Sequence, residues 1–215
     1  MSQCQIVSSD ILSELLEVAF NSIIYSRQLY PREIFTKKKI YSTAVYISEH
    51  PEVNDYLRNI ILSVKELLDS DVTSVKKINF VICDDEQKEI ERVVFDLMEF
   101  RFTDNEAFLI HRKDPYFLKT EDALRELNLR LLMSDNYLSK LPKDCTFFIE
   151  IETNESAHIG LSENPKCLEF PWIVKKPSGQ LTQQSDNNYL LPLTTIKTEY
   201  LGLQIFVKTS NPLNK

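Results

Sequence analysis

The spacing of hydrophobic positions along the chain predicts three helices. Between about Ser9 and Tyr30, apolar residues recur every three or four positions, and their band is too wide for a helix with one exposed face. We therefore expect this first helix to be central and covered on several sides. Two later segments carry a narrower apolar stripe, from Pro51 to about Asp69 and from about Thr120 to Leu141. A proline at the first helical position favours the start of the earlier one.

Four other segments predict strands, because they alternate apolar and polar residues or are rich in β-branched and aromatic residues. They are Ile40–Ser48, Lys76–Cys83, Glu89–Glu99 and Cys145–Thr153. The second and third of these are joined by a short polar stretch, which predicts a β-hairpin. Residues 100–117 have no clear period and predict a connecting loop or a ragged extension of a strand.

The last third of the chain has a different pattern. Residues 154–188 contain several prolines and predict a loop, although they enclose the apolar block Phe170–Val174. Two short strand-like runs follow, near Tyr189–Thr195 and Tyr200–Lys208. No linker and no internal repeat divides the sequence. The pattern therefore predicts a single α+β domain with a loosely patterned β tail.

Composition and charge narrow the choice of partners and compartment. The chain is 43% hydrophobic and 27% charged, with a formal net charge of -7. Because binding to phosphates favours a basic surface, we expect protein partners and no direct contact with nucleic acid. The cysteines are widely spaced, lack zinc-like spacings and predict free thiols in a reducing compartment. They are Cys4, Cys83, Cys145 and Cys167. We find no signal peptide and no apolar run long enough for a bilayer, so we expect a soluble, intracellular protein.

A search for catalytic chemistry finds no candidate. The three glycines are scattered and late in the chain, which disfavours a phosphate-binding loop. The nucleophile pattern G-x-S-x-G is absent. Glu150 and Glu152 alternate with apolar residues, so we expect them on the solvated face of a strand. The sequence therefore predicts a protein without catalytic residues, metal site or cofactor.

Two features leave alternatives open. Trp172 is the only tryptophan and lies in a proline-containing apolar segment. It is either a core residue under a loop or an aromatic platform for a peptide, since indole faces pack well against proline rings. Lys37–Lys39 is the only basic run. We interpret it as a solvated approach to a strand, in preference to a nuclear-import or phosphate-contact motif.

A series of ordered motifs resembles the HORMA-domain family. Within that family the similarity is to the accessory, non-catalytic subunits of translesion DNA polymerase zeta, which are mitotic-arrest-deficient-like proteins. The resemblance extends from about Asp10 to Val207. The motifs are ELLEVA at 14–19, IYSR at 24–27, YP-x-x-IF at 30–35, HPEVN-x-Y at 50–56, CTF at 145–147, FPWI at 170–173 and LPL at 191–193.

The resemblance implies three helices packed on a mostly antiparallel sheet and a mobile C-terminal "safety belt". The belt closes over a peptide and pins it at the edge of the sheet. The corresponding boundaries are a tail at 1–9, a HORMA domain at 10–209 with its core at about 10–152 and its belt at about 153–209, and a tail at 210–215.

The resemblance also assigns residues to three surfaces. The peptide-binding surface comprises Tyr56, Ser63, Met133 and Trp172, of which the two aromatics bracket a proline-containing ligand. The surface that docks the C-terminal domain of a second translesion polymerase comprises Leu190, Gln204 and Phe206. The surface that pairs with another HORMA domain comprises Lys37, Arg125 and Asn136. Family members often carry cysteine at position 63, a smaller apolar residue at 133, a smaller residue at 136 and tyrosine at 206.

The function implied is that of an adaptor in DNA damage tolerance. It would join the catalytic subunit of polymerase zeta to an insertion polymerase. The expected location is the nucleus, with the cytoplasm as an additional location that the sequence does not exclude. Shieldin-type end-protection proteins and a remodelling AAA+ ATPase are further partners known for the family. The alternative is a spindle-checkpoint or meiotic chromosome-axis adaptor with different peptide ligands.

Overall fold

A computed structural model describes residues 3–71, 73–97, 114, 116–155, 157, 170, 172–175 and 189–213. The helices in this part of the chain are α1 (Gln3–Ser26), α2 (Pro51–Ser70) and α4 (Leu118–Met133), with short 3-10 turns η1 (Arg32–Ile34) and η3 (Ser134–Asn136). The strands are β1 (Phe35–Ile40), β2 (Thr43–Ser48), β3 (Val75–Cys83), β4 (Glu89–Asp96), β5 (Thr146–Thr153), β6 (Tyr189–Lys197) and β7 (Gly202–Thr209).

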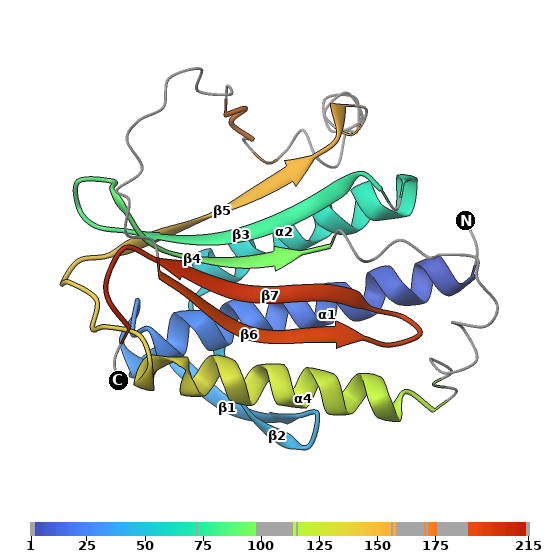
Figure 1. Cartoon of the computed structure of the whole chain (residues 1–215), viewed down its shortest axis with the longest axis horizontal. Helices are drawn as coiled ribbons and strands as arrows, with labels where there is room; N and C mark the ends of the chain where they lie inside the picture. Colours follow the sequence, from blue (N-terminus) through green and yellow to red (C-terminus); the bar gives the residue numbers. More distant parts are fainter. Residues whose placement is uncertain are drawn as a thin grey trace.

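Five of these strands form one antiparallel sheet in the order β5-β3-β4-β7-β6. The helices cover one face of it, and α1 lies between α2 and α4 (Figure 1). Phe20 of α1 is fully buried and packs against Phe80 of β3 and Phe95 of β4, with ring centroids 5.7 and 5.8 Å away. The predicted α+β class and the central position of the first helix are therefore confirmed.

The segment predicted as one strand, Ile40–Ser48, is instead part of a two-stranded hairpin of β1 and β2. Tyr41 and Ser42 turn the chain, with φ of 51° and 57°. Two successive left-handed residues are typical of a type I′ turn, but glycine or asparagine usually supplies them. The turn is favoured here because the Tyr41 side chain packs against the helical core. Lys37–Lys39 lie on β1 and are exposed, as expected of a solvated strand.

The ends of α1 also differ from the prediction. The helix begins at Gln3 and not near Ser9, so residues 3–9 are helical. It ends at Ser26 because Gln28 adopts a left-handed conformation with φ of 53°. The N–H of Leu29 then bonds to the C=O of Ile24, and the N–H of Gln28 bonds to the C=O of Tyr25. These two bonds form a Schellman C-cap.

The other predicted elements agree more closely with the structure. The helix predicted from Pro51, the hairpin of β3 and β4, and the strand β5 are confirmed within a few residues at each end. The third helix is shorter than predicted, since α4 ends at Met133 and η3 follows. The two strand-like runs of the last third form the hairpin of β6 and β7. Most of the segments 100–117 and 154–188 lie outside the described residues.

Candidate functional site

The outer edge of β5 is the open edge of the sheet next to α2. Among the described residues, β5 pairs with β3 on one side and with no strand on the other. The hairpin of β6 and β7 lies at the opposite end of the sheet (Figure 1). An edge strand has backbone N–H and C=O groups without ladder partners, so it can take up a further strand from another chain.

A group of aromatic side chains, hereafter the aromatic cluster, lies beside this edge. It comprises Tyr56 of α2, Phe147 of β5, and Phe170 and Trp172 from the C-terminal third. The Tyr56 ring lies 5.8 Å from Phe147 and 5.9 Å from Phe170, and Phe170 lies 4.8 Å from Trp172. Phe147 also stacks on the buried Phe80 at 4.7 Å, which anchors the cluster in the core.

The cluster carries two polar groups in an otherwise apolar setting. The Tyr56 hydroxyl accepts a hydrogen bond from the backbone N–H of Ile149 at 3.1 Å. Burial raises the pKa of this hydroxyl, although the bond from Ile149 acts in the opposite direction. The indole Nε1 of Trp172 is buried and has no hydrogen-bond partner among the described residues. The next two side chains, Ile173 and Val174, are 92% and 61% exposed and offer apolar contact area.

Ion pairs attach the segment after Trp172 to the other face of the sheet. The Lys175 ammonium pairs with the carboxylate of Glu150 on β5, which also pairs with Arg92 of β4. Burial alone would raise the pKa of Glu150. Hydrogen bonds from Lys175 and Arg92 outweigh that effect, so the pKa lies below its ordinary value. Glu152 is exposed as predicted, whereas Glu150 is partly buried by these two cations.

The structure separates the four residues of the expected peptide-binding surface. Tyr56 and Trp172 belong to the aromatic cluster. Ser63 is buried on α2, and its hydroxyl donates to the C=O of Asn59 at 2.9 Å, so it is already satisfied within its own helix. Met133 is 53% exposed at the end of α4, on the far side of α1 from α2 (Figure 1). Met133 therefore does not belong to the aromatic cluster.

The residues expected to dock a second polymerase share one face of the sheet. On β7, Gln204 and Phe206 alternate with buried residues and point away from the helices. The register pairs Leu190 with Lys208 and Pro192 with Phe206, so Leu190 projects from the same face. Leu190 is 54% exposed, and Phe206 lies under the Lys208 ammonium.

The residues of the expected HORMA-pairing surface lie on neighbouring elements. Lys37 and Asn136 are exposed on β1 and η3, and Arg125 of α4 pairs with Asp122 one turn earlier. The hairpin of β1 and β2 is held to α4 by a hydrogen bond from the Asn128 amide to the C=O of Ala44 at 3.0 Å.

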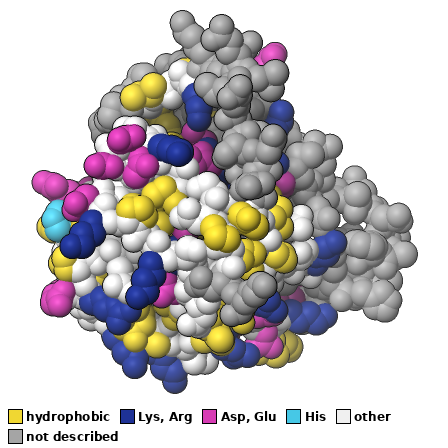
Figure 2. Space-filling view, turned by 60° about the vertical axis from the view of Figure 1, so that its left-hand side comes forward, with side chains coloured by type: hydrophobic (Ala, Val, Ile, Leu, Met, Phe, Trp, Pro, Cys, Tyr) yellow, Lys and Arg dark blue, Asp and Glu magenta, His cyan; other side chains and the backbone are white. Residues whose placement is uncertain are grey.

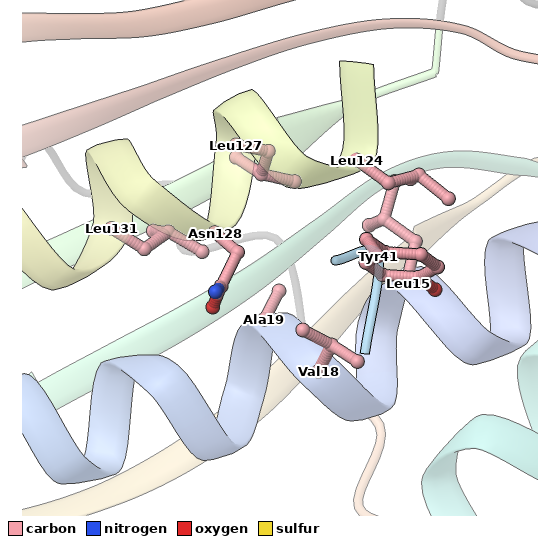
Figure 3. A pocket seen from close by; sticks show the side chains of 8 residues that line it. All are labelled: Leu15, Val18, Ala19, Tyr41, Leu124, Leu127, Asn128 and Leu131. Atoms are coloured by element: carbon pink, nitrogen blue, oxygen red, sulfur yellow. The ribbon is translucent and has the colours of Figure 1, made fainter. Parts of the chain in front are cut away.

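A narrow hollow between α1, α4 and Tyr41 leaves no room for even a water molecule. Figure 3 shows its lining, which comprises Leu15, Val18, Ala19, Tyr41, Leu124, Leu127, Asn128 and Leu131. Both ends of the Asn128 amide have hydrogen-bond partners. Its NH₂ group donates to the C=O of Ala44, and its oxygen accepts from the hydroxyl of Ser22. The hollow is an apolar packing space between helices and offers no reactive group.

The surface is mixed in charge. On the face in Figure 2, basic side chains gather in the lower part, acidic ones lie at the upper left, and hydrophobic ones lie between them. None of the described helices has the length and apolar character of a membrane span. Within the described ranges, no His, Cys, Asp or Glu side chains group as metal ligands would.

The sequence model of the HORMA-domain family matches residues 8–160 of this chain. The chain belongs to the HORMA-domain family. Over 202 residues, this HORMA protein is 32% identical to the mitotic spindle assembly checkpoint protein MAD2B of Rattus norvegicus, covering 94% of this chain and 90% of that one. It is 28% identical over 207 residues to DNA polymerase zeta subunit 2 of Drosophila melanogaster, covering 95% and 98%. A chain in the crystal structure of the mitotic checkpoint complex has the same fold, with a TM-score of 0.74, 21% identity, and coverage of 95% and 99%.

Sequence reasoning did not assign Phe147, Phe170 or the link between Glu150 and Lys175 to the site of this HORMA domain. Phe147 shares one face of β5 with Ile149 and Ile151, which indicates that it faces the helices. The pattern does not reveal that Phe147 contacts Tyr56 of α2. Phe170 belongs to the FPWI motif, but only the fold places it between Tyr56 and Trp172.

Proposed function

We propose that this HORMA protein is a non-enzymatic adaptor that captures a proline-containing peptide segment of a partner along the outer edge of β5. The observation that carries the proposal is the open edge of β5 beside the aromatic cluster. Backbone groups of an edge strand supply general affinity, and side-chain pockets beside it supply selectivity. The cluster would supply that selectivity through its aromatic faces, because tyrosine and tryptophan rings pack well on proline.

We further propose that the captured segment belongs to the catalytic subunit of DNA polymerase zeta. Support comes from the similarity to a protein named DNA polymerase zeta subunit 2, which spans nearly the whole of both chains. The sheet face with Leu190, Gln204 and Phe206 would then dock the C-terminal domain of a second translesion polymerase, so that the adaptor joins two polymerases. This role would place the protein in the nucleus.

The proposal is tested with overlapping fragments of the polymerase zeta catalytic subunit from the same organism. We expect one fragment to bind with submicromolar affinity, and alanine at Tyr56 or Trp172 to weaken it by about 2 kcal/mol or more, as expected of aromatic hot spots. Tyr116→Ala is the control, because this tyrosine is 79% exposed in the turn before α4. Binding that survives both alanine substitutions would place the peptide elsewhere.

A spindle-checkpoint adaptor is the second candidate, because the rat relative is named as a mitotic spindle assembly checkpoint protein. The two candidates differ in the ligand and not in the fold. If fragments of spindle-checkpoint proteins bind at the aromatic cluster and no polymerase fragment does, the second candidate replaces the first.

A further inference from the structure

The turn between β6 and β7 is fixed by its own hydrogen bonds. The N–H of Thr198 donates to the C=O of Leu201 at 2.8 Å, and the Thr198 hydroxyl accepts from the N–H groups of Tyr200 and Leu201. Thr198 and Leu201 are both buried. The turn lies at the same end of the molecule as the start of α4 (Figure 1). A contact that holds this turn therefore also holds the adjoining ends of both strands.

Two side chains of the turn contact the segment that precedes α4. The carboxylate of Glu199 accepts a hydrogen bond from the backbone N–H of Asp114 at 2.6 Å. The ring of Tyr200 stacks on that of Phe117, with the centroids 4.8 Å apart and the planes 23° from parallel. These four residues, hereafter the hairpin latch, connect the tip of the β6–β7 hairpin to the helical layer.

The latch lies beyond the last pair of the ladder between β4 and β7. Among the described residues, this ladder ends at the pair of Asp96 and Gln204, and the chain continues through Leu203 and Gly202 to the turn. A strand ladder frays from its ends, because a terminal pair has a neighbour on one side only. The latch is therefore at one of the two places where separation of β7 from β4 would begin.

The α4 side of the latch is held firmly. Asp114 is buried, and its carboxylate accepts from the N–H of Lys119 at 3.1 Å and from the N–H and hydroxyl of Thr120 at 2.8 Å. Burial alone would raise the pKa of Asp114, but these hydrogen bonds outweigh that effect and the pKa lies below its ordinary value. An ionised carboxylate is favoured at the start of a helix. The backbone N–H that Glu199 needs is thereby fixed in place.

Phe117 has a backbone conformation that its own sequence does not favour. Its φ of 57° and ψ of 14° are left-handed, which is uncommon for a bulky residue. Its ring is 43% exposed, so burial in the core does not account for the conformation. Such a conformation persists where the surroundings hold it. The stack on Tyr200 is a contact that this conformation makes available.

We propose that the hairpin latch holds the tip of β6 and β7 against α4 and thereby controls how often β7 separates from β4. The latch is a conformational device of this chain, and its existence does not depend on any ligand. Its effect on ligand lifetime rests on the peptide-capture function above, because a peptide held under the C-terminal third leaves only when the hairpin opens.

Amide hydrogen exchange in the free protein tests the latch directly. In Phe117→Ala, the protected amides of residues 202–206 should exchange about 3- to 10-fold faster than in the wild type, which is the value of one aromatic pair. Amides of β3 should not change, because they report on the rest of the sheet. Tyr116→Ala is the matched control, since Tyr116 directly precedes Phe117 and is 79% exposed.

Two further variants separate the contacts of the latch from the strain of the turn. Phe117→Gly adopts the left-handed conformation without strain but lacks the ring, so β7 should exchange as fast as in Phe117→Ala. Glu199→Ala should also accelerate exchange, and Glu199→Gln should do so less, because its amide oxygen can still accept from Asp114. Wild-type exchange in Phe117→Gly would overturn the inference, since the turn would then need no ring.

A double variant tests whether Phe117 and Tyr200 act through each other. Exchange in Phe117→Ala, Tyr200→Ala should be slower than the product of the two single effects, because the stack is lost once only. Fully multiplicative effects would overturn the role of the stack. Unchanged exchange in both Phe117→Ala and Glu199→Ala, or equal acceleration in β3 and β7, would overturn the inference as a whole.

The effect on ligand lifetime is measured with the tightest-binding fragment from the polymerase scan. Trp172 is the only tryptophan, so its fluorescence can follow release after an excess of unlabelled competitor is added. Release should be about 3- to 10-fold faster in Phe117→Ala and unchanged in Tyr116→Ala. Unchanged release in Phe117→Ala would overturn control of ligand lifetime by the latch. If no fragment binds the wild type, the proposed function fails, and hydrogen exchange alone decides whether the latch exists.

Discussion

The guanidinium of Arg27 and the carboxylate of Glu91 form an ion pair inside the protein, and their side chains are only 3% and 1% exposed. Arg27 also pairs with Asp135 and donates to the C=O of Ser139, so the end of α1 is tied to β4 and to the chain after α4. All of these bonds converge on one side chain. A buried charge that loses its partner remains desolvated and uncompensated.

We expect Arg27→Met to lower the free energy of unfolding by about 3–5 kcal/mol, because Glu91 is left buried without a counter-charge. Arg58→Met is the control, since Arg58 pairs with Asp55 at the surface and should cost less than about 1 kcal/mol. Urea denaturation at neutral pH measures both. The double variant Arg27→Met, Glu91→Leu should recover part of the loss, and a double variant less stable than Arg27→Met would contradict this explanation.

The ion pairs of Glu150 should make attachment of the Lys175 segment dependent on pH. The pKa of Glu150 is lowered in the folded protein, so its contribution to stability is present above the unfolded pKa of about 4.3 and is lost as the pH falls through the lower folded pKa. Glu150→Gln should cost about 1 kcal/mol at pH 7, because one partner, Lys175, is 74% exposed and well screened.

The measurement is urea denaturation of wild type and Glu150→Gln between pH 7 and pH 3. The difference between the two should shrink toward zero at the acidic end. Glu126→Gln, which removes an exposed pair with Arg130 on α4, should show little difference at any pH. A constant difference for Glu150→Gln across this range would mean that its charge does not hold the segment.

The sheet face of β6 and β7 should bind its partner independently of the peptide site. We expect Leu190→Ala and Phe206→Ala to weaken binding of the C-terminal domain of a second translesion polymerase by about 1–2 kcal/mol, because each removes apolar contact area. Calorimetry with that domain measures the loss. Affinity for the polymerase zeta fragment should stay unchanged in both variants. Loss of both ligands together would indicate unfolding of the hairpin.

Charge reversal at Arg125 tests the expected pairing with another HORMA domain. If the protein self-associates, Arg125→Glu should shift it toward the monomer in sedimentation at micromolar concentration. Arg130→Glu on the same helix is the matched control, because the Arg130 side chain is also exposed, at 52% against 39% for Arg125, and pairs with Glu126 one turn earlier. An unchanged oligomeric state in Arg125→Glu would remove this residue from the pairing surface.

Much of the fold follows from the sequence, where apolar periodicity matches burial. The stripe of α2 and the alternation of β3 and β5 predict these elements to within a few residues. The missed features are turns formed by unusual residues. Nothing local marks Tyr41–Ser42 as a hairpin turn or Gln28 as a helix cap, since glycine or asparagine normally provides the left-handed conformation. Packing of Tyr41 on α1 and α4 outweighs that local preference.

The candidate site is harder to predict from the sequence, because its residues come from segments that are far apart along the chain. Resemblance identifies Tyr56 and Trp172, but Phe170 joins them only in the fold. The bond between Ile149 and Tyr56 depends on how α2 crosses beneath β5, which no periodicity specifies. Likewise, the partners of Glu150 lie on β4 and in the C-terminal third, so its alternation indicates only which face it occupies.

The strand order has a consequence for how a ligand enters and leaves. The chain leaves β5 at one edge of the sheet and returns as β6 at the opposite edge, and in between it contributes Phe170 and Trp172 to the aromatic cluster. If the proposed peptide lies on β5 beneath Phe170 and Trp172, the continuous chain from β5 to β6 would enclose it. A ligand in the middle of a long protein has no free end to thread through such a ring. Exchange of such a ligand would then require β7 to separate from β4, and that barrier would make the lifetime of the complex longer than its contacts alone provide.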